Sequence, residues 1–390
     1  MIKKTLCFIT FILLTFSVYA QSNTIKFIKG NISEKTAAVR EASGEEAILL
    51  SNKAIEFSLE NKEYLGNDRE LDGLVVAAVY SISADYVKGA SEAQKKSISN
   101  QFIKLYSSFK ESSTVEIALL SRIVVLKNYL PTNDFADSLN AYLKNINIQN
   151  AEPSVFKSVL STLETIGNTD TYLILFNYLN NPKFKNFYSE IERTVSALIP
   201  TSMNETLAII QASDISQITQ IFTLTAKNSQ ITKNNLCEIS EKVLSKSILL
   251  LDDFSKTTQE DIKIQQEALK ILETNKWTRA SSTVLSYFQL AKRQYDNGIL
   301  NTEQFTAVIK SLSSITPIDS VSILTVYLEE LNTQTEKGNK PSDEVVLSVI
   351  KTLGAIGDKS AFDSLLAVTY LTYSESVLTA AREALSGLRW

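Results

Sequence analysis

The chain has 390 residues, of which 44% are hydrophobic and 21% are charged, and its formal net charge is −4. This composition is typical of a globular chain with enough apolar residues for a core, and it excludes an intrinsically disordered protein. The small acidic excess argues against nucleic acid and against anionic membrane surfaces as partners, because both require a clustered positive face.

The chain contains no histidine and only two cysteines, Cys7 and Cys237. The lack of histidine excludes Ser-His-Asp and Cys-His nucleophile systems and histidine zinc sites. Two cysteines are too few for a thiolate metal centre. We therefore expect no metal, no cofactor and no catalytic residue, and we expect that the protein is not an enzyme. A carboxylate-based or lysine-based enzyme is the alternative that this argument leaves open.

Ser-x-x-Lys, a spacing compatible with a Ser-Lys nucleophile, occurs at Ser107/Lys110, Ser154/Lys157 and Ser348/Lys351. The partner motifs SDN and KTG are absent from the sequence. The three copies therefore do not predict catalysis.

The first 20 residues have the features of a signal peptide. Lys3 and Lys4 precede an apolar run that ends at Val18, and Val18-Tyr19-Ala20 supplies small residues for cleavage between Ala20 and Gln21. This run is shorter than the roughly 20 residues that span a bilayer, which favours a cleaved leader, and an uncleaved anchor is the alternative. The leader and the Lys/Asn/Ile/Ser-rich composition predict an exported bacterial protein, periplasmic or secreted, without stable membrane insertion after cleavage.

From residue 79 onward, the same apolar stripe recurs at helical spacing. Around Leu353, for example, Val349, Ile350 and Ile356 lie on one helix face. Similar stripes are centred on seven anchor residues, with a degenerate copy expected near residue 235: Val79, Ile123, Leu163, Leu198, Leu272, Leu312 and Leu353. The stripe is weak around Leu198, and around Leu272 it lacks one apolar residue. Their spacing of about 40 residues is typical of helical-hairpin solenoids.

The C-terminal repeats resemble the HEAT family. LGAIGDKSAFDSLLAV (353–368) followed by VLTAAREAL (377–385) is similar to that family's pattern, and LETIGNTDTYLILFNYL (163–179) is a second, degenerate match. In HEAT arrays an Asp and an Arg can bond neighbouring turns. The resemblance places Asp358 with Arg382 in these positions, and Asn168 with Arg193 as a weaker pair.

These patterns predict an all-α fold: an α-solenoid of about eight antiparallel helix hairpins over residues 34–390, preceded by an arm at residues 21–33. The prolines agree, because all six fall between predicted helices: Pro131, Pro153, Pro182, Pro200, Pro317 and Pro341. Whether residues 199–262 follow the hairpin order is left open.

A tyrosine followed by Leu or Phe recurs near the ends of the helical segments: Tyr142, Tyr178, Tyr287, Tyr327 and Tyr370. One interpretation is a row of rings that forms a binding surface; the alternative is that the rings fill grooves between consecutive repeats. Cys237 lies at an apolar helical position and is expected to be buried, with a reactive thiol as the alternative.

The sequence favours an exported scaffold that binds a protein or peptide partner in the cell envelope. The alternatives are the carboxylate- or lysine-based enzyme or enzyme subunit and an accessory protein of envelope assembly. A deep pocket with two convergent acids would favour the enzyme, whereas a smooth open groove would favour the scaffold.

Overall fold

The computed structural model describes residues 23–253 and 257–389, and within these ranges the regular structure is helical. The one β feature of this part of the chain is an isolated parallel bridge between Asp358 and Arg389. The predicted all-α class is therefore confirmed. The chain divides into two compact units, Met1–Ser202 and Met203–Trp390. The predicted leader and its Ala20/Gln21 cleavage site lie outside the described residues.

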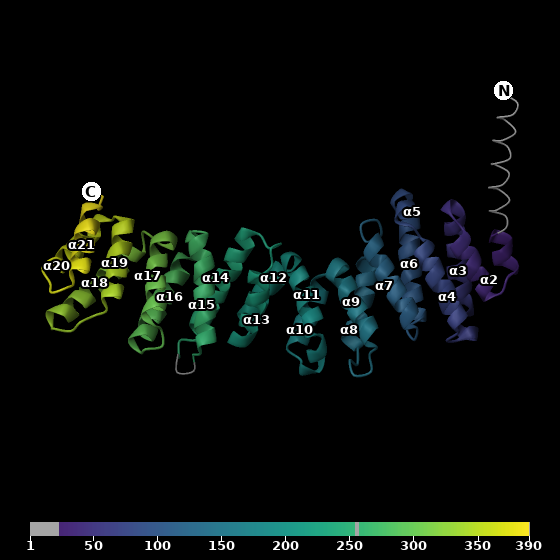
Figure 1. Cartoon of the computed structure of the whole chain (residues 1–390), viewed down its shortest axis with the longest axis horizontal. Helices are drawn as coiled ribbons and strands as arrows, with labels where there is room; N and C mark the ends of the chain where they lie inside the picture. Colours follow the sequence, from purple (N-terminus) through teal and green to yellow (C-terminus); the bar gives the residue numbers. More distant parts are fainter. Residues whose placement is uncertain (1–22, 254–256, 390) are drawn as a thin grey trace, which may run out of the picture. The chain divides into compact units, whose positions relative to one another are not determined.

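The first unit is built from consecutive helices joined by short connections (Figure 1). Their bounds are α2 Ile32–Glu41, α3 Gly44–Leu65, α4 Arg69–Ser81, α5 Ala84–Gly89, α6 Glu92–Ser108, α7 Ser113–Leu126, α8 Asn133–Asn145, α9 Pro153–Ile166, α10 Thr169–Leu179, η1 Pro182–Phe187, α11 Tyr188–Leu198 and η2 Ile199–Thr201.

These helices form two rows. The first row holds α2, α4, α7, α9 and α11, each packed on the next, and the second holds α3, α6, α8 and α10. Each first-row helix from α4 to α11 also packs on the second-row helix that precedes it, which gives the helix pairs α3/α4, α6/α7, α8/α9 and α10/α11. A single pair cannot bury both of its apolar stripes, and stacking on its neighbours buries them.

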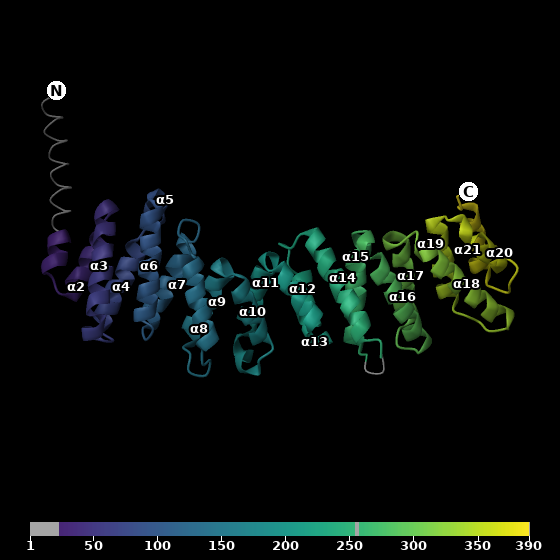
Figure 2. The same cartoon turned by 180° about the vertical axis from the view of Figure 1, so that it is seen from behind.

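The second unit repeats this design, as seen from the other side in Figure 2. The bounds of its helices are α12 Met203–Ala212, α13 Ile215–Ala226, α14 Lys233–Leu250, α15 Gln259–Thr274, η4 Thr278–Ala280, α16 Ser281–Asp296, α17 Thr302–Ile315, α18 Ser320–Glu336, α19 Asp343–Ile356, η5 Lys359–Ala361, α20 Phe362–Val368 and α21 Glu375–Ser386. Here α13, α15, α17, α19 and α21 form one row, and each packs on the helix that precedes it.

All seven anchor residues are buried, and each lies on a helix of these rows. The prediction of a degenerate copy near residue 235 is wrong. That position lies in α14, which packs between α12 and α16. The helix that precedes α15 in its own row, which holds the anchors Leu272, Leu312 and Leu353, is α13. The long interval between Leu198 and Leu272 is thus not two equal steps. Within residues 199–262, the described helices α12, α13 and α14 do keep the paired order.

Local sequence explains where these helices begin. Asn31, Ser91, Asn168, Thr258 and Asn301 each form a capping box, in which the side chain accepts a backbone N–H that would otherwise be unpaired. All six prolines lie outside α-helix interiors, as predicted, and Pro153 occupies the first position of α9.

Part of the predicted N-terminal arm is itself helical, over residues 23–29. Phe27 is buried, and its carbonyl accepts a hydrogen bond from Lys35 Nζ. Lys26 forms an ion pair of 3.0 Å with Glu41 of α2. Among the described helices, none is both long and apolar enough to cross a membrane.

Candidate functional site

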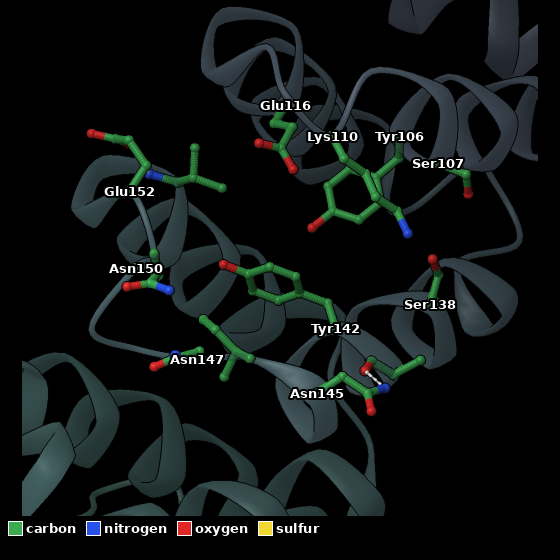
Figure 3. A pocket seen from close by; sticks show the side chains of 14 residues that line it. Tyr106, Ser107, Lys110, Glu116, Ser138, Tyr142, Asn145, Asn147, Asn150 and Glu152 are labelled. Atoms are coloured by element: carbon green, nitrogen blue, oxygen red, sulfur yellow. Dashed lines mark hydrogen bonds between the residues drawn. The ribbon is translucent and has the colours of Figure 1, made fainter.

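The first unit contains a pocket of about 550 Å³ between the pairs α6/α7 and α8/α9 (Figure 3). Its walls come from the end of α6, the connection from α6 to α7, the start of α7, the middle and end of α8, the connection from α8 to α9 and the start of α9. The lining residues are Tyr106, Ser107, Lys110, Glu116, Ser138, Ala141, Tyr142, Asn145, Ile146, Asn147, Asn150, Ala151, Glu152 and Val155.

Two short connections position these residues. Between α6 and α7, Phe109 is fully buried, and the hydroxyl of Ser112 accepts the N–H of Val115 and donates to Asp72 at 2.7 Å. This tight turn places Lys110 and Glu116 on the same pocket. Between α8 and α9, the chain runs past the pocket before α9 begins at Pro153.

Glu116 is the unusual residue of the site, because it is an acidic residue that is only 6% exposed and its carboxyl lines the pocket. It has no hydrogen-bond or ion-pair partner among the described residues. Burial raises the pKa of Glu116 to about 7; the charge of Glu152 adds to this rise and that of Lys110 opposes it. An unpaired buried carboxylate is costly, so the site favours a ligand that compensates it.

Two tyrosines face the same space. Tyr106 is 2% exposed, its ring packs on Phe135 at 5.6 Å between centroids, and its hydroxyl has no hydrogen-bond partner in the described chain. Burial, and then the charge of Glu116, raise its pKa well above the ordinary value. Tyr142 is half-buried, and burial, Glu116 and Glu152 raise its pKa to about 12. In Figure 3 both hydroxyls and the Glu116 carboxyl point into the pocket.

The second acid of the pocket, Glu152, caps a helix. Its exposed carboxylate caps α9 by accepting the N–H of Val155 at 2.9 Å and the hydroxyl of Ser154, and these hydrogen bonds lower its pKa. In Figure 3 this carboxylate is turned away from Glu116. The pocket is therefore lined by two acids, but only Glu116 is directed into it. Within the described ranges, no group of three or more His, Cys, Asp or Glu side chains could hold a metal ion.

The recurring tyrosines do not form one exposed row. The rings of Tyr287 and Tyr327 are buried, at 0% and 5% exposure, and the Tyr287 hydroxyl accepts a hydrogen bond from Gln266 at 3.1 Å. For these two rings, burial agrees with the alternative interpretation, in which the tyrosines fill grooves between repeats, and contradicts an exposed row. Tyr370 is 80% exposed, in the turn after α20.

The two tyrosines of the first unit differ from each other. Tyr178 is half-buried; its ring stacks on Phe184 at 3.7 Å, and its hydroxyl donates to the carbonyl of Leu143. Tyr142 is the only one of the five that lines the pocket described above. Of the five tyrosines that the sequence suggested as a binding row, Tyr142 is therefore the one that lies at this candidate site.

The Asp–Arg pairing that the HEAT resemblance implied is not found between these residues. The carboxylate of Asp358 caps η5 by accepting the N–H of Ser360, whereas Arg382 pairs with Glu375 at 3.0 Å. In the weaker pair, Asn168 caps α10, and Arg193 binds Glu164 at 2.8 Å. The cap expected at Asp358 is present. The arginines instead bind glutamates of their own or the neighbouring helix.

Cys237 lies on α14 with its side chain fully buried, so the burial expected from the sequence is confirmed. Burial raises the pKa of its thiol above the ordinary value.

Sequence reasoning missed Tyr106 and Glu116, although one signal was present. Glu116 lies two helical turns before the anchor Ile123, on the apolar stripe of α7. The equivalent positions before the other six anchors are mostly buried and apolar, with two polar exceptions: Phe156, Ile191, Phe305 and Val346 are apolar, and Asp72 and Gln265 are polar. A carboxyl in that register predicts either a partner or a site.

No protein-family model matches the chain, and no curated protein does. Seven chains of solved structures match it. One of them is in the crystal complex of SYS-1 and POP-1, with 10% sequence identity and a TM-score of 0.28 over 92% of this chain. This chain spans 64% of the length of that one. A likeness of this degree identifies neither a family nor a function, so the functional argument rests on the pocket.

Proposed function

We propose that this protein is an exported, periplasmic helical-repeat scaffold of HEAT-like type that binds a protein or peptide partner in the cell envelope at the pocket of its first unit. The observation that carries the proposal is the buried, unpartnered hydroxyl of Tyr106, which lines one pocket together with the carboxyl of Glu116, a group without a hydrogen-bond or ion-pair partner among the described residues. Buried polar groups normally have partners, and an orphan at a pocket is a reason to expect a ligand.

Export is supported by the charged start, apolar run and small residues of 1–20. Stacked helix pairs support the scaffold role by analogy, because such folds commonly present extended binding surfaces.

One observation favours the alternative, an enzyme that works through a carboxyl group. A glutamate with a pKa of about 7 is suited to general acid or base chemistry near neutral pH. Hydrolysis with two carboxylates would require Glu152 as the second group, and the carboxylate of Glu152 is held as the cap of α9. The scaffold is therefore our first proposal, and a single-carboxyl enzyme is the second.

A random peptide library tests the two proposals. The purified protein and its Tyr142→Ala variant are each screened, and the selected peptides are titrated by calorimetry. We expect sequences that bind the wild type and lose at least about tenfold in affinity for the variant, equivalent to about 1.4 kcal/mol. As a control, Tyr64→Ala removes an 86% exposed ring elsewhere in the unit and is expected to leave binding unchanged.

Failure to select any peptide, or equal binding by the variant, contradicts the scaffold proposal. Mass spectrometry of the bound peptides separates the enzyme from the scaffold. A chemical change that requires Glu116 supports the enzyme, whereas intact peptides support the scaffold.

A further inference from the structure

We propose that the pocket of the first unit recognises a primary ammonium group, supplied by a lysine side chain or by a free amino terminus of the partner. This inference rests on the proposed function and specifies the ligand of that site. Three features support it: the acceptors directed into the pocket, the charges around it, and the absence of a cation bound to Glu116 within the described chain.

The acceptors match the geometry of an ammonium ion. An ammonium has three N–H donors and no acceptor. Three oxygen groups converge on the pocket from three helices: the Glu116 carboxyl from α7, the Tyr106 hydroxyl from α6 and the Tyr142 hydroxyl from α8 (Figure 3). Glu116 and Tyr106 are residues more than nine-tenths buried, the Tyr106 hydroxyl is a buried group without a partner, and Glu116 has no hydrogen-bond or ion-pair partner in the described part of the chain.

The charges select a cation over an anion. Two acids and one base line the pocket, and Lys110 is exposed. Lys110 is not within ion-pair distance of Glu116 among the described residues. A carboxylate or phosphate ligand would place a second negative charge beside a buried carboxyl, which is unfavourable. A neutral hydroxyl ligand could satisfy Tyr106 but would leave the carboxylate of Glu116 without a counter-charge.

An ammonium is also a better match than a guanidinium. Arginine presents five donors in a planar fork, which suits a carboxylate that is open to bidentate binding. Here the acceptors come from three different helices, and only one of them is a carboxyl. A compact, point-like cation on a flexible stem fits this arrangement better.

The first test compares peptides that differ in one functional group. The protein, purified from cells that express the full chain, is titrated with an acetylated and amidated glycine pentapeptide carrying one central lysine. Matched peptides carry norleucine or arginine at the same place, and a further one is all-glycine with a free amino terminus. We expect saturable binding of the lysine or the free-terminus peptide, and at least about tenfold weaker binding of the norleucine and arginine peptides.

These peptides separate the possible results. Tighter binding of the lysine peptide identifies a side chain as the source, and tighter binding of the free-terminus peptide identifies the chain end. Equal binding of lysine and norleucine overturns the ammonium inference and leaves the scaffold proposal standing. If none of the four binds but library peptides bind at Tyr142, the ammonium inference is again wrong. If no library peptide binds either, the scaffold proposal fails with it.

The second test changes the acceptors. Glu116→Gln keeps the shape of the side chain but removes its charge, and we expect it to weaken the ammonium-bearing peptide at least about tenfold. Tyr106→Phe removes one hydroxyl, and we expect about fivefold weaker binding. The matched control Glu63→Gln makes the same charge change at an exposed position of α3 and is expected to leave binding unchanged.

If Tyr106 had a purely structural role, removal of its hydroxyl would lower the thermal unfolding midpoint of the ligand-free protein. The hydroxyl is buried without a partner, so we instead expect Tyr106→Phe to leave this midpoint unchanged or raised. Weaker binding together with an undiminished midpoint supports a ligand contact. Unchanged binding in both acceptor variants, with circular dichroism like that of the wild type, overturns the inference.

Discussion

The side-chain amide of Asn140 on α8 donates a hydrogen bond of 3.0 Å to the side-chain oxygen of Asn168, the residue that caps α10. The carbonyl oxygen of the same Asn140 amide accepts a hydrogen bond of 2.7 Å from the hydroxyl of Thr171. Asn140 and Thr171 are both buried. One side chain thus joins the cap of a helix to the preceding helix pair, which fixes how the two pairs stack.

Replacing Asn140 tests this connection. Asn140→Ala removes the shorter of the two hydrogen bonds of the buried Thr171 hydroxyl, whose other acceptor is the Asn168 side chain at 3.2 Å, and it deprives Asn168 of a donor. Because two hydrogen bonds of the buried Asn140 side chain are lost, we expect a loss of about 2 kcal/mol in the free energy of unfolding. Urea unfolding followed by circular dichroism measures it. The control Asn177→Ala, at an exposed position of α10, is expected to change stability by less than about 0.5 kcal/mol. Equal effects of the two variants would show that the network does not stabilise the stack.

The stack itself follows from the sequence, because its cause is periodic. Residues such as Ile123 and Leu312 recur at the same phase of successive helices, and a stripe of this kind must be buried on a neighbour. Each helix repeats the same requirement, so the prediction does not depend on any single contact. The wrong prediction near residue 235 has the same origin. The buried residues of α13 include Ile221 and Phe222, and they do not lie at the position that equal spacing between Leu198 and Leu272 predicts.

The pocket could not be predicted in this way, because it depends on departures from the repeat. Glu116 is visible in the sequence as a charge on an apolar stripe, but its convergence with Tyr106 and Tyr142 depends on how two particular pairs pack. The tyrosine pattern was misleading for the same reason. Tyr327 and Tyr370 occupy similar places before an apolar residue, yet one is buried and the other exposed. A recurring residue type therefore does not define a recurring surface.

Two glycines provide a test with opposite expected signs. Gly357 ends α19 in the left-handed region, with φ of 73°, and an added Cβ would lie 3.2 Å from the carbonyl oxygen of Gly387. Gly357→Ala is therefore expected to destabilise the fold by about 1–2 kcal/mol. Gly73 lies inside α4 with no atom within 4 Å of an added Cβ. Gly73→Ala should stabilise by about 0.5–1 kcal/mol in the same urea unfolding assay.

If Gly357→Ala proves neutral, the left-handed end of α19 is not required for folding. A destabilising Gly73→Ala would instead indicate a contact that helix propensity does not account for.

The buried thiol of Cys237 predicts low chemical reactivity. The thiolate is the nucleophile, and burial raises the pKa of this thiol while the fold shields it from reagents. We expect Cys237 in the native protein to resist alkylation by iodoacetamide under conditions that label it fully in urea, as measured by mass spectrometry of the peptide that contains it. Rapid labelling of Cys237 in the native protein, or a dimer linked through Cys237 on a non-reducing gel, would instead support the reactive-thiol interpretation of the sequence.

Glu116 links the candidate site to stability. Its folded-state pKa of about 7 lies above the ordinary value of 4.5 for a glutamate, so between these two pH values the folded chain holds a proton that the unfolded chain has released. Tyr106, Lys110, Tyr142 and Glu152 are the titratable groups around this carboxyl in the pocket. The folded state binds more protons here, so stability must fall as the pH rises through this window.

We therefore expect the free energy of unfolding to decrease between about pH 4.5 and pH 7 by an amount that Glu116→Gln removes. At about 1.4 kcal/mol per pKa unit, the contribution of this one group is at most about 3 kcal/mol, because the carboxyl lines an open pocket and solvent screens it, and the contribution is constant above about pH 7. Urea unfolding of the wild type, of Glu116→Gln and of the exposed control Glu63→Gln across this range measures the effect. The control should follow the wild type, whereas the Glu116 variant should gain stability relative to it as the pH rises. Parallel curves for all three proteins would mean that the carboxyl of Glu116 is hydrated or paired in solution, and the charge argument for the pocket would then lose its basis.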